Sequence, residues 1–524
     1  MAVCASAALS YEPFSMSEDE IKIRGSFLSI DRPERLFKLA ALCLVSFAAV
    51  LVATKVDLSN VKLVSLGMLV AIAVVAVVLH SGQFRRVILF LFVVSQSYFR
   101  TYSLTGHYVF LTTFDPYWTF CDVFLVMLAG IALWQRVFER KPATPRPNYL
   151  WLWWLPFLLA ITVSCANAIN MKWAVFEVWR QAKVFLILLI LPTLIRDETD
   201  WFVILAALGT SVAGQAWLGV AQLFLGGGVE LLGETTIRAN GTLGHPNQLS
   251  SYIEQIWPIF GVLVLAPRKI LGVWNPWLRR GAAFVSVSAL VGIGVAQSRA
   301  VWFTASLQIT AILCCFILMR RANFKRVVGS AVLAVTLVAV AAVPFSARIA
   351  SRFGGNLQDS VEFREKFDQV AILMYLDHPV IGGGPRQFPL QFARRKYSLY
   401  GRVAHRIPDF PVHNLYLLYL DEFGALGFMG FVVFLGTMFG AYVTAYRRCD
   451  TFGRMVILGC GFGFLAMLMH EMSEFVLTLD PNLFTWPIII CLATSATLYR
   501  AGAPGELPER AAELPHALPA EVSA

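Results

Sequence analysis

The chain alternates long apolar runs with short polar connections. A helix needs about 20 consecutive apolar residues to cross the hydrocarbon core of a bilayer, and by that criterion the pattern predicts about 14 spans, within a range of roughly 12 to 14. The run that starts near residue 415 is long enough to begin as a surface helix before it enters the lipid. The expected spans are 37–54, 61–80, 87–99, 118–138, 149–167, 176–195, 200–226, 247–267, 281–297, 300–319, 327–346, 415–446, 455–470 and 483–499.

One long polar segment, 347–413, interrupts the series of apolar runs. Within it, Phe363, Phe367, Val370 and Met374 recur at helical spacing, which predicts an amphipathic helix over 360–376. The expected fold is therefore an all-α polytopic membrane protein with one large loop that contains amphipathic helices. Its expected parts are a cytoplasmic tail, N-terminal transmembrane helices, a second transmembrane domain that includes the loop, and a disordered cytoplasmic tail, at 1–36, 37–199, 200–499 and 500–524.

Composition supports the membrane class. Hydrophobic residues make up 57% of the chain and the mean hydropathy is +0.65, whereas soluble domains are about 45–50% apolar. The net charge of +10 is explained by the basic residues that cytoplasmic loops accumulate, so no nucleic-acid partner is expected. The nine cysteines show no metal or redox spacing.

The basic residues also predict an orientation. With the N-terminus inside, most Lys and Arg fall in inner connections, and few fall in short outer ones. The residues assigned to short outer connections include Arg180, Lys183, Arg238 and Arg299. Both termini are therefore expected in the cytoplasm, with all the unusual polar stretches on the outer face.

The first of these stretches is 236–250. Gly241 and Gly244 permit tight turns, and Pro246 suits the first position of a helix. A helix N-terminus beside Arg238 can bind an anion. For His245 the alternative is a plain helix cap, and this pattern does not separate the two interpretations.

The second stretch, 297–302, places Arg299 between two apolar runs with almost no loop. Either the side chain snorkels to the interface, or its planar guanidinium binds a lipid diphosphate. Glu254, inside the eighth span, could pair with either arginine, and we expect it to be structural support.

The third region is the long segment itself. Its glycine-rich turn at 377–388 lacks the lysine of a phosphate-binding loop, so we expect a loop that shapes a site. Its basic residues could contact lipid head groups or an anionic glycan. His413 ends the segment, with Asn414 and Tyr416 behind it. A histidine with a pKa near 6.5 can act as a base at neutral pH, but it can also simply cap a helix at the interface.

Four stretches together resemble the motifs of the bacterial O-antigen ligase and polymerase superfamily. They are Arg-Ala-Asn-Gly-Thr-Leu-Gly-His-Pro-Asn at 238–247, Ser-Arg-Ala-Val-Trp at 298–302, Asp-His-Pro-Val-Ile-Gly-Gly-Gly-Pro-Arg-Gln-Phe at 377–388 and His-Asn-Leu-Tyr-Leu at 413–417. The resemblance covers roughly residues 200 to 490 and keeps the motif order. It implies a metal-independent glycosyltransferase without cofactor, in the bacterial inner membrane, with its active site on the periplasmic face. The implied partners are an undecaprenyl-diphosphate-linked glycan donor, an acceptor glycolipid (lipid A-core) or second lipid-linked glycan, and membrane lipids.

The resemblance also assigns roles to residues. Arg238 and Arg299 match the diphosphate-binding arginines, and His413 matches the catalytic base. The further candidates for substrate binding are His245, Asn247, Arg364, Arg386, Asn414 and Tyr416. The predicted span number exceeds the family's usual twelve by about two, which leaves the N-terminal helices outside the family pattern.

Two alternatives remain open at this stage. A transporter or flippase would also have many spans, but it usually places polar residues near the bilayer midplane, and here the inward spans look almost uniformly apolar. Within the transferases, a ligase and a polymerase of exopolysaccharide or O-antigen repeats use the same donor chemistry. The motifs resemble the ligase branch more closely, but the acceptor and the sugar are not predicted.

Overall fold

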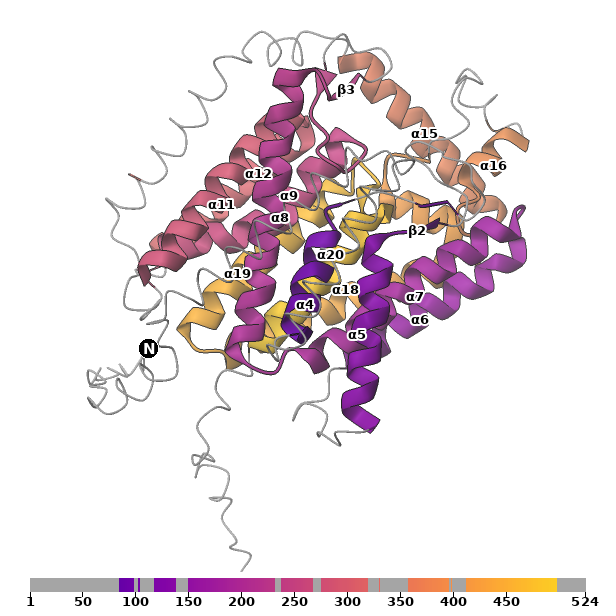
Figure 1. Ribbon diagram of the computed structural model, residues 1–524. Coiled ribbons are helices and arrows are strands. Elements are labelled where there is room, and N and C mark those ends of the chain that lie inside the picture. The colour runs from indigo at the N-terminus through magenta and orange to yellow at the C-terminus, as the bar shows by residue number, and fades with distance from the viewer. Residues whose placement is uncertain are drawn as a thin grey trace, which may run out of the picture.

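The computed structural model describes residues 84–98, 102–103, 117–137, 149–230, 237–266, 275–318, 329, 357–394, 397 and 411–496. This part of the chain is mostly helical (Figure 1). The predicted spans 37–54 and 61–80 and both predicted tails lie outside these residues, and so does 327–346 apart from residue 329. The count of about 14 spans therefore stays a prediction.

The helices match the predicted apolar runs closely, because each apolar run ends in polar or capping residues. Their bounds are α4 Phe84–Ser95, α5 Phe120–Val137, α6 Leu150–Ser164, η1 Cys165–Asn167, α7 Met171–Leu194, α8 Glu198–Leu225, α9 Pro246–Leu265, α11 Asn275–Ala296, α12 Arg299–Leu318, α15 Leu357–Asp377, α16 Phe388–Arg394, α18 Leu415–Arg448, α19 Thr451–His470, η4 Val476–Thr478 and α20 Asp480–Ser495.

Two helices form the centre of the bundle. Nearly every residue of α9 and α20 is buried. Helices α8, α11, α12 and α19 pack around α9, and α18 packs on α6 while α7 packs on α20. At Gly459 and Gly463 the backbone of α19 lies directly against the backbone of α9, so that a Cβ at either glycine would clash. This close contact fixes the position of α19 relative to α9, and residues on or next to these two helices form much of the site described below.

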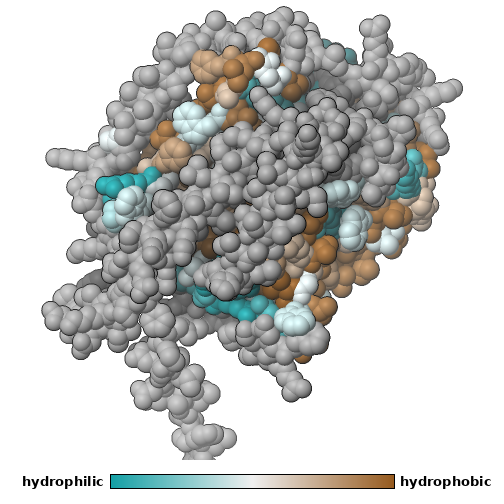
Figure 2. Space-filling model, viewed as in Figure 1, coloured by the Kyte–Doolittle hydropathy of each residue, from teal (hydrophilic) through white to brown (hydrophobic). Residues whose placement is uncertain are grey.

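The bundle has the exterior of a membrane protein. Seven helices in the described ranges are long and apolar enough to cross a membrane: α5, α6 with η1, α8, α11, α12, α18 and α19. Figure 2 shows hydrophobic side chains over much of the visible described surface, with hydrophilic ones in separate patches. Exposed tryptophans, Trp153 and Trp179 among them, belong to this surface.

The assignment of Arg180 and Lys183 to a short outer connection was wrong. Helix α7 spans Met171–Leu194, and both residues lie within it and are buried. Arg180 Nε donates to Asp480 Oδ1 at 2.6 Å, and Lys183 Nζ donates to Asp122 Oδ1 at 2.8 Å. Buried charges require such partners, and these two residues do not add positive charge to an outer loop.

The predicted amphipathic helix is confirmed as α15. Its Phe367, Val370 and Met374 are buried in a small core of their own, together with side chains of α16, Val412 at the start of the α18 segment, and Phe475. The described part of the long loop thus forms a packed cap on one end of the bundle, where α15 and α16 lie in Figure 1. Through Val412 and Phe475, the cap supports the backbone next to His413 and Glu474.

The glycine-rich turn has a structural role that the sequence did not reveal. Helix α18 is broken at Gly424, whose φ is 64°. On one side of the break, the amides of Gly383 and Gly384 donate to the carbonyls of Asp421 and Glu422, at 2.7 and 3.0 Å. On the other side, the first amides of the second half donate back to the carbonyls of residues 379 and 380. The loop therefore satisfies the backbone groups that the break leaves without helical partners.

Short strands are the only departure from the all-α expectation in the described ranges. Strand β1 (Tyr102–Ser103) pairs antiparallel with β2 (Tyr117–Trp118), and β3 (Val229–Glu230) pairs antiparallel with β4 (Ile237–Arg238). The second pair matters for the site, because it brings Arg238 back from the end of α8.

The other end of α8 carries a different charge cluster. Arg85 donates to Asp200 Oδ2 at 2.7 Å, and Arg86 bridges Asp197 and Asp200. Asp197 also caps α8 through a capping box with Asp200. Arg238 and the cap helices lie at the opposite end of the bundle from this cluster, and the side of the membrane on which each end lies stays a prediction.

Candidate functional site

The turn before α9 is built as its residues predicted. Gly241 and Gly244 have φ values of 60° and 73°, and Pro246 begins the helix. His245 is the N-cap, and its Nδ1 accepts a hydrogen bond from the amide of Asn247 at 3.1 Å. His245 therefore does cap the helix, as the simpler of its two interpretations predicted.

Two glutamines of α8 hold this turn against the bundle. Gln215 accepts from the amide of Thr242 at 2.9 Å, and Gln222 accepts from the amide of Gly241 at 2.8 Å. Because a Cβ at Gly241 would lie only 2.2 Å from the Gln215 oxygen, the position requires glycine for space as well as for its backbone conformation.

Arg238 joins this turn to the start of α12. Arg238 is 2% exposed, and its guanidinium donates to the carbonyls of Ala296 and Gln297 at 2.9 and 3.2 Å. The backbone of Gln297 is left-handed, with φ 54°, and Arg299 begins α12 two residues later in a half-buried position. Arg238 therefore fixes the turn that presents Arg299.

Glu474 connects the first sequence motif with the long polar segment. It is 4% exposed, and its Oε1 accepts from Asn247 Nδ2 at 2.7 Å and from Arg364 at 2.8 Å. The same Asn247 accepts from Arg238 through Oδ1 at 2.9 Å. A continuous chain of contacts thus runs from Arg238 through Asn247 and Glu474 to Arg364.

His413 lies beside this chain. Its ring is edge-on to Phe475 with 5.3 Å between ring centroids, and the next segment is tied down where Leu415 donates its amide to the Glu474 carbonyl at 3.1 Å. Its Nδ1 is buried and makes no hydrogen bond within the described part of the chain. A half-buried imidazole that has a nitrogen without a hydrogen-bond partner among the described residues can accept a proton.

The electrostatics of the pair follow from burial and mutual charge. Burial lowers the pKa of His413, Glu474 opposes this shift, and Arg364 adds to it, so the net pKa is below 6.5. Burial would raise the pKa of Glu474, but the positive charges of His413 and Arg364 outweigh it and leave the pKa below its ordinary value. At neutral pH the site therefore holds a carboxylate beside a neutral imidazole.

Three other predicted residues make mainly structural contacts. Asn414 caps α18 by accepting from the amides of Tyr416 and Leu417. Tyr416 donates its hydroxyl to the Leu468 carbonyl at 2.8 Å. Arg386 pairs with Glu177 at 3.0 Å, in the ionic network of α7.

Sequence reasoning missed Glu474 and, apart from Glu254, the buried polar residues of α9. Glu254 was expected to pair with an arginine, but its partners are His470 and Thr304. The spans are not almost uniformly apolar, because the N-terminal half of α9 buries Gln248, Ser250, Ser251, Glu254 and Gln255. Those five polar residues in a predicted span were a visible signal, because such residues usually face the bundle interior. Glu474 gave no comparable signal, since it follows a span in an ordinary polar turn.

Fold and site together define a polytopic helical membrane protein with a buried polar site of Arg, His, Asn and Glu at one end of the bundle. Residues 284–432 match the model of a family described as O-antigen ligase, which confirms the resemblance to the O-antigen ligase superfamily. The match begins within α11 and ends within α18, a shorter range than the motifs suggested. No curated protein matches the chain. The family match indicates a glycosyltransferase-type membrane enzyme of polysaccharide biosynthesis.

The matched range supplies only one half of the site. It contains Arg299, Arg364 and His413, but Arg238, Asn247 and Glu474 lie outside it. The contacts of Asn247 and Glu474 with Arg364 show that the flanking helices complete the same cluster.

Proposed function

We propose that this protein transfers an oligo- or polysaccharide from undecaprenyl diphosphate to an acceptor hydroxyl at the periplasmic face of the bacterial inner membrane, as an O-antigen ligase does. The observation that carries the proposal is the contact chain Arg238–Asn247–Glu474–Arg364 with His413 beside it. It unites residues from distant parts of the sequence in one cluster around the buried Glu474.

The proposed chemistry needs two things from the protein. The diphosphate leaving group gains negative charge, which guanidinium groups stabilise without a metal. In this arrangement Arg299 contacts the diphosphate, and Arg238 contributes its charge while it holds the turn that carries Arg299. The acceptor hydroxyl loses its proton as it attacks the sugar, and His413 accepts that proton as a general base.

Glu474 has the supporting part. Its carboxylate orients Asn247 and Arg364 by direct contact and stabilises the imidazolium that forms when His413 takes the proton. His245, Asn414 and Tyr416 shape the surrounding backbone through the contacts described above.

Purified protein in nanodiscs, given a labelled undecaprenyl-diphosphate glycan with and without lipid A-core, tests this function. We expect labelled product that needs the core and survives a chelator. His413→Ala should lower the rate by about 10²–10⁴-fold while donor binding persists, since that is the usual contribution of a general base. Ladders without the core would indicate a polymerase, and no glycosidic product under either condition would contradict the transferase assignment.

The arginines can be tested with the same assay. Arg299→Lys keeps the positive charge but loses the planar fork that suits paired phosphate oxygens. We expect the KM for the lipid-linked donor to rise about tenfold, which corresponds to about 1.4 kcal/mol. Lys172→Ala, on the exposed first turn of α7, is the control for loss of a basic charge. An unchanged KM in Arg299→Lys would remove Arg299 from diphosphate binding.

A further inference from the structure

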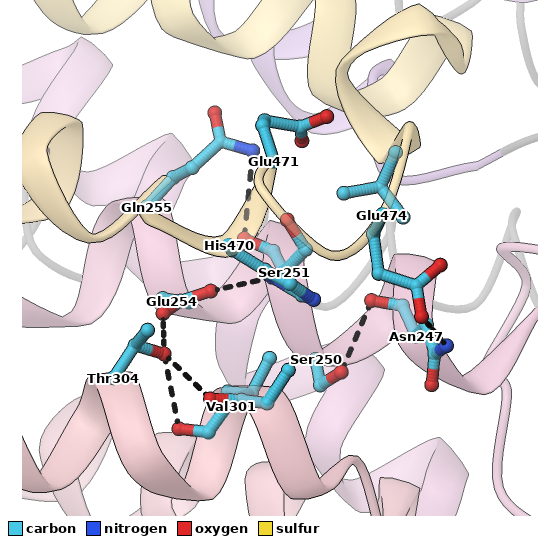
Figure 3. A network of polar contacts seen from close by, with 12 residues as sticks. Asn247, Ser250, Ser251, Glu254, Gln255, Val301, Thr304, His470, Glu471 and Glu474 are labelled. Carbon is cyan, nitrogen blue, oxygen red and sulfur yellow. Dashed lines mark hydrogen bonds and ion pairs between the residues drawn. The ribbon is translucent and has the colours of Figure 1, made fainter. Parts of the chain in front are cut away.

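A buried pair of ionisable residues lies directly behind the site (Figure 3). His470 is the last residue of α19, and its Nδ1 lies 2.9 Å from Oε2 of Glu254 in α9. Neither side chain is exposed. Thr304 of α12 donates its hydroxyl to the other carboxylate oxygen of Glu254. Because a carboxylate accepts, the structure assigns the donor role to His470 Nδ1.

Glu254 therefore joins three helices, and each of them carries a site residue toward its outer end. Asn247 lies about two turns before Glu254 in α9, and Arg299 lies a little over one turn before Thr304 in α12. Glu474 follows the end of α19 by the length of about one turn. The contacts of Glu254 thus set the relative heights of these three helix ends.

The turn after α19 transmits the position of His470 toward His413. Ser473 donates its hydroxyl to the His470 carbonyl at 3.1 Å. The amide of Leu415 donates to the carbonyls of both Glu471 and Glu474, at 3.0 and 3.1 Å. The backbone that carries His413 is therefore bonded to the turn that begins at His470.

Stability alone does not account for this pair. Removing two polar or charged groups from water costs free energy, and well-packed apolar residues in their place are often neutral or stabilising. The close backbone contact at Gly459 and Gly463 already fastens α19 to α9 further along the helix. What the polar pair adds is a directional contact at the outer end, next to Glu474.

We propose that Glu254 and His470 are positioning residues, which hold Glu474 and through it His413 in the arrangement that the proposed transfer requires. This inference rests on the proposed function. In this proposal His470 acts through the hydrogen bond that Nδ1 donates to Glu254. Nε2 is also buried, and it makes no hydrogen bond within the described residues. Glu254 acts by accepting hydrogen bonds from His470 and Thr304.

Two amide substitutions of His470 separate the ring nitrogens. The amide nitrogen of His470→Asn can occupy the place of Nδ1 and donate to Glu254, whereas that of His470→Gln reaches toward the place of Nε2. We expect His470→Asn to keep kcat within about threefold of wild type and His470→Gln to lose at least tenfold, since small misplacements of catalytic groups have large effects. The KM for the donor should change little in both. Activity of His470→Gln equal to or above that of His470→Asn overturns the proposal.

A second pair of variants tests Glu254 at nearly constant volume. Glu254→Gln can accept from His470 through its amide oxygen and donate from its amide nitrogen to the Thr304 hydroxyl, which can then donate to the Ala300 carbonyl. Glu254→Leu can form neither bond. We expect the glutamine variant to stay within about threefold of wild type and the leucine variant to lose at least tenfold in kcat. This pair decides the question if neither histidine variant accumulates in the membrane. An inactive Glu254→Gln would show that its charge, rather than its position, is needed, and would overturn the proposal.

A measurement that does not depend on catalysis can test this inference separately from the proposed function. Carbethoxylation of His413 by diethyl pyrocarbonate, followed by peptide mass spectrometry across pH, reports the neutral imidazole. Glu474 raises the pKa of His413 and Arg364 lowers it, so displacing Glu474 should shift the midpoint to lower pH. We expect the shift in His470→Gln and Glu254→Leu but not in His470→Asn. Equal midpoints in all variants overturn the positioning role, even if wild-type protein shows no transfer at all.

Discussion

His413 shows how the surroundings of a single residue determine its chemistry. Burial and the charge of Arg364 disfavour the imidazolium, and Glu474 partly restores it. The resulting pKa, below the ordinary value, keeps the ring neutral at pH 7 and able to accept a proton. The sequence could identify the histidine, but not the sign of this shift, because both charged neighbours are distant in the chain.

The pH dependence of turnover follows from this sign. We expect kcat/KM to be level near neutral pH and to fall only below the ordinary histidine value of about 6.5, as His413 becomes protonated. Glu474→Gln removes the charge that raises the pKa of His413, so its acid limb should lie at still lower pH. Initial rates between about pH 5 and 8 provide the measurement. A wild-type acid limb above pH 6.5 would argue against His413 as the base.

Glu474 should also make the stability of the folded protein depend on pH. Because its pKa is lowered in the folded protein, its ionised form stabilises the fold above its unfolded value of about 4.3. That contribution is lost as pH falls through the lower folded value. We expect the unfolding temperature in detergent to fall more steeply below about pH 4.5 in wild type than in Glu474→Gln. Parallel curves would mean that the ion pair with Arg364 contributes nothing.

At the scale of elements, the break in α18 depends on two glycines in direct backbone contact. A Cβ at Gly382 would lie 2.4 Å from the Glu422 carbonyl carbon, and one at Gly424 would lie 2.4 Å from the Gly382 nitrogen. Both residues have positive φ. From sequence alone, a glycine-rich turn that serves this purpose looks the same as one that cradles a ligand.

Alanine substitutions test this interpretation. We expect Gly382→Ala and Gly424→Ala each to destabilise the protein by at least ~2 kcal/mol, because strained φ and a backbone clash add together. Gly436→Ala, in the same helix with nothing within 4 Å of its Cβ position, should be neutral or stabilising. Unfolding temperatures measured in one detergent allow the comparison. Equal temperatures for Gly424→Ala and Gly436→Ala would show that the break is not needed for stability.

At the scale of the whole molecule, the predicted orientation can be tested on one helix. Thr199 and Gly227 are exposed at opposite ends of α8. In spheroplasts, a membrane-impermeant maleimide should label Gly227→Cys, and Thr199→Cys only after permeabilisation, compared with the parent chain. The reverse result would place the site on the cytoplasmic side and exclude a periplasmic transferase.

Sequence reasoning was most successful where structure depends on local pattern. The described helices, the amphipathic α15 and the turn before α9 follow from apolar periodicity, glycine and proline. It was least successful where function depends on contacts between distant segments. The hydrogen bond of Asn247 with Glu474 spans 227 positions, and the helix break of α18 depends on a loop that precedes it by about 40 residues.

The distance between those partners has a consequence for biosynthesis. Arg238 and Asn247 enter the membrane with the middle of the chain, whereas Glu474 leaves the ribosome only after α19. During that interval Asn247 and Arg364 lack the carboxylate that joins them. A nascent chain stalled before α19 should therefore contain these arginines but no assembled site, which would delay the proposed transfer until synthesis is nearly complete.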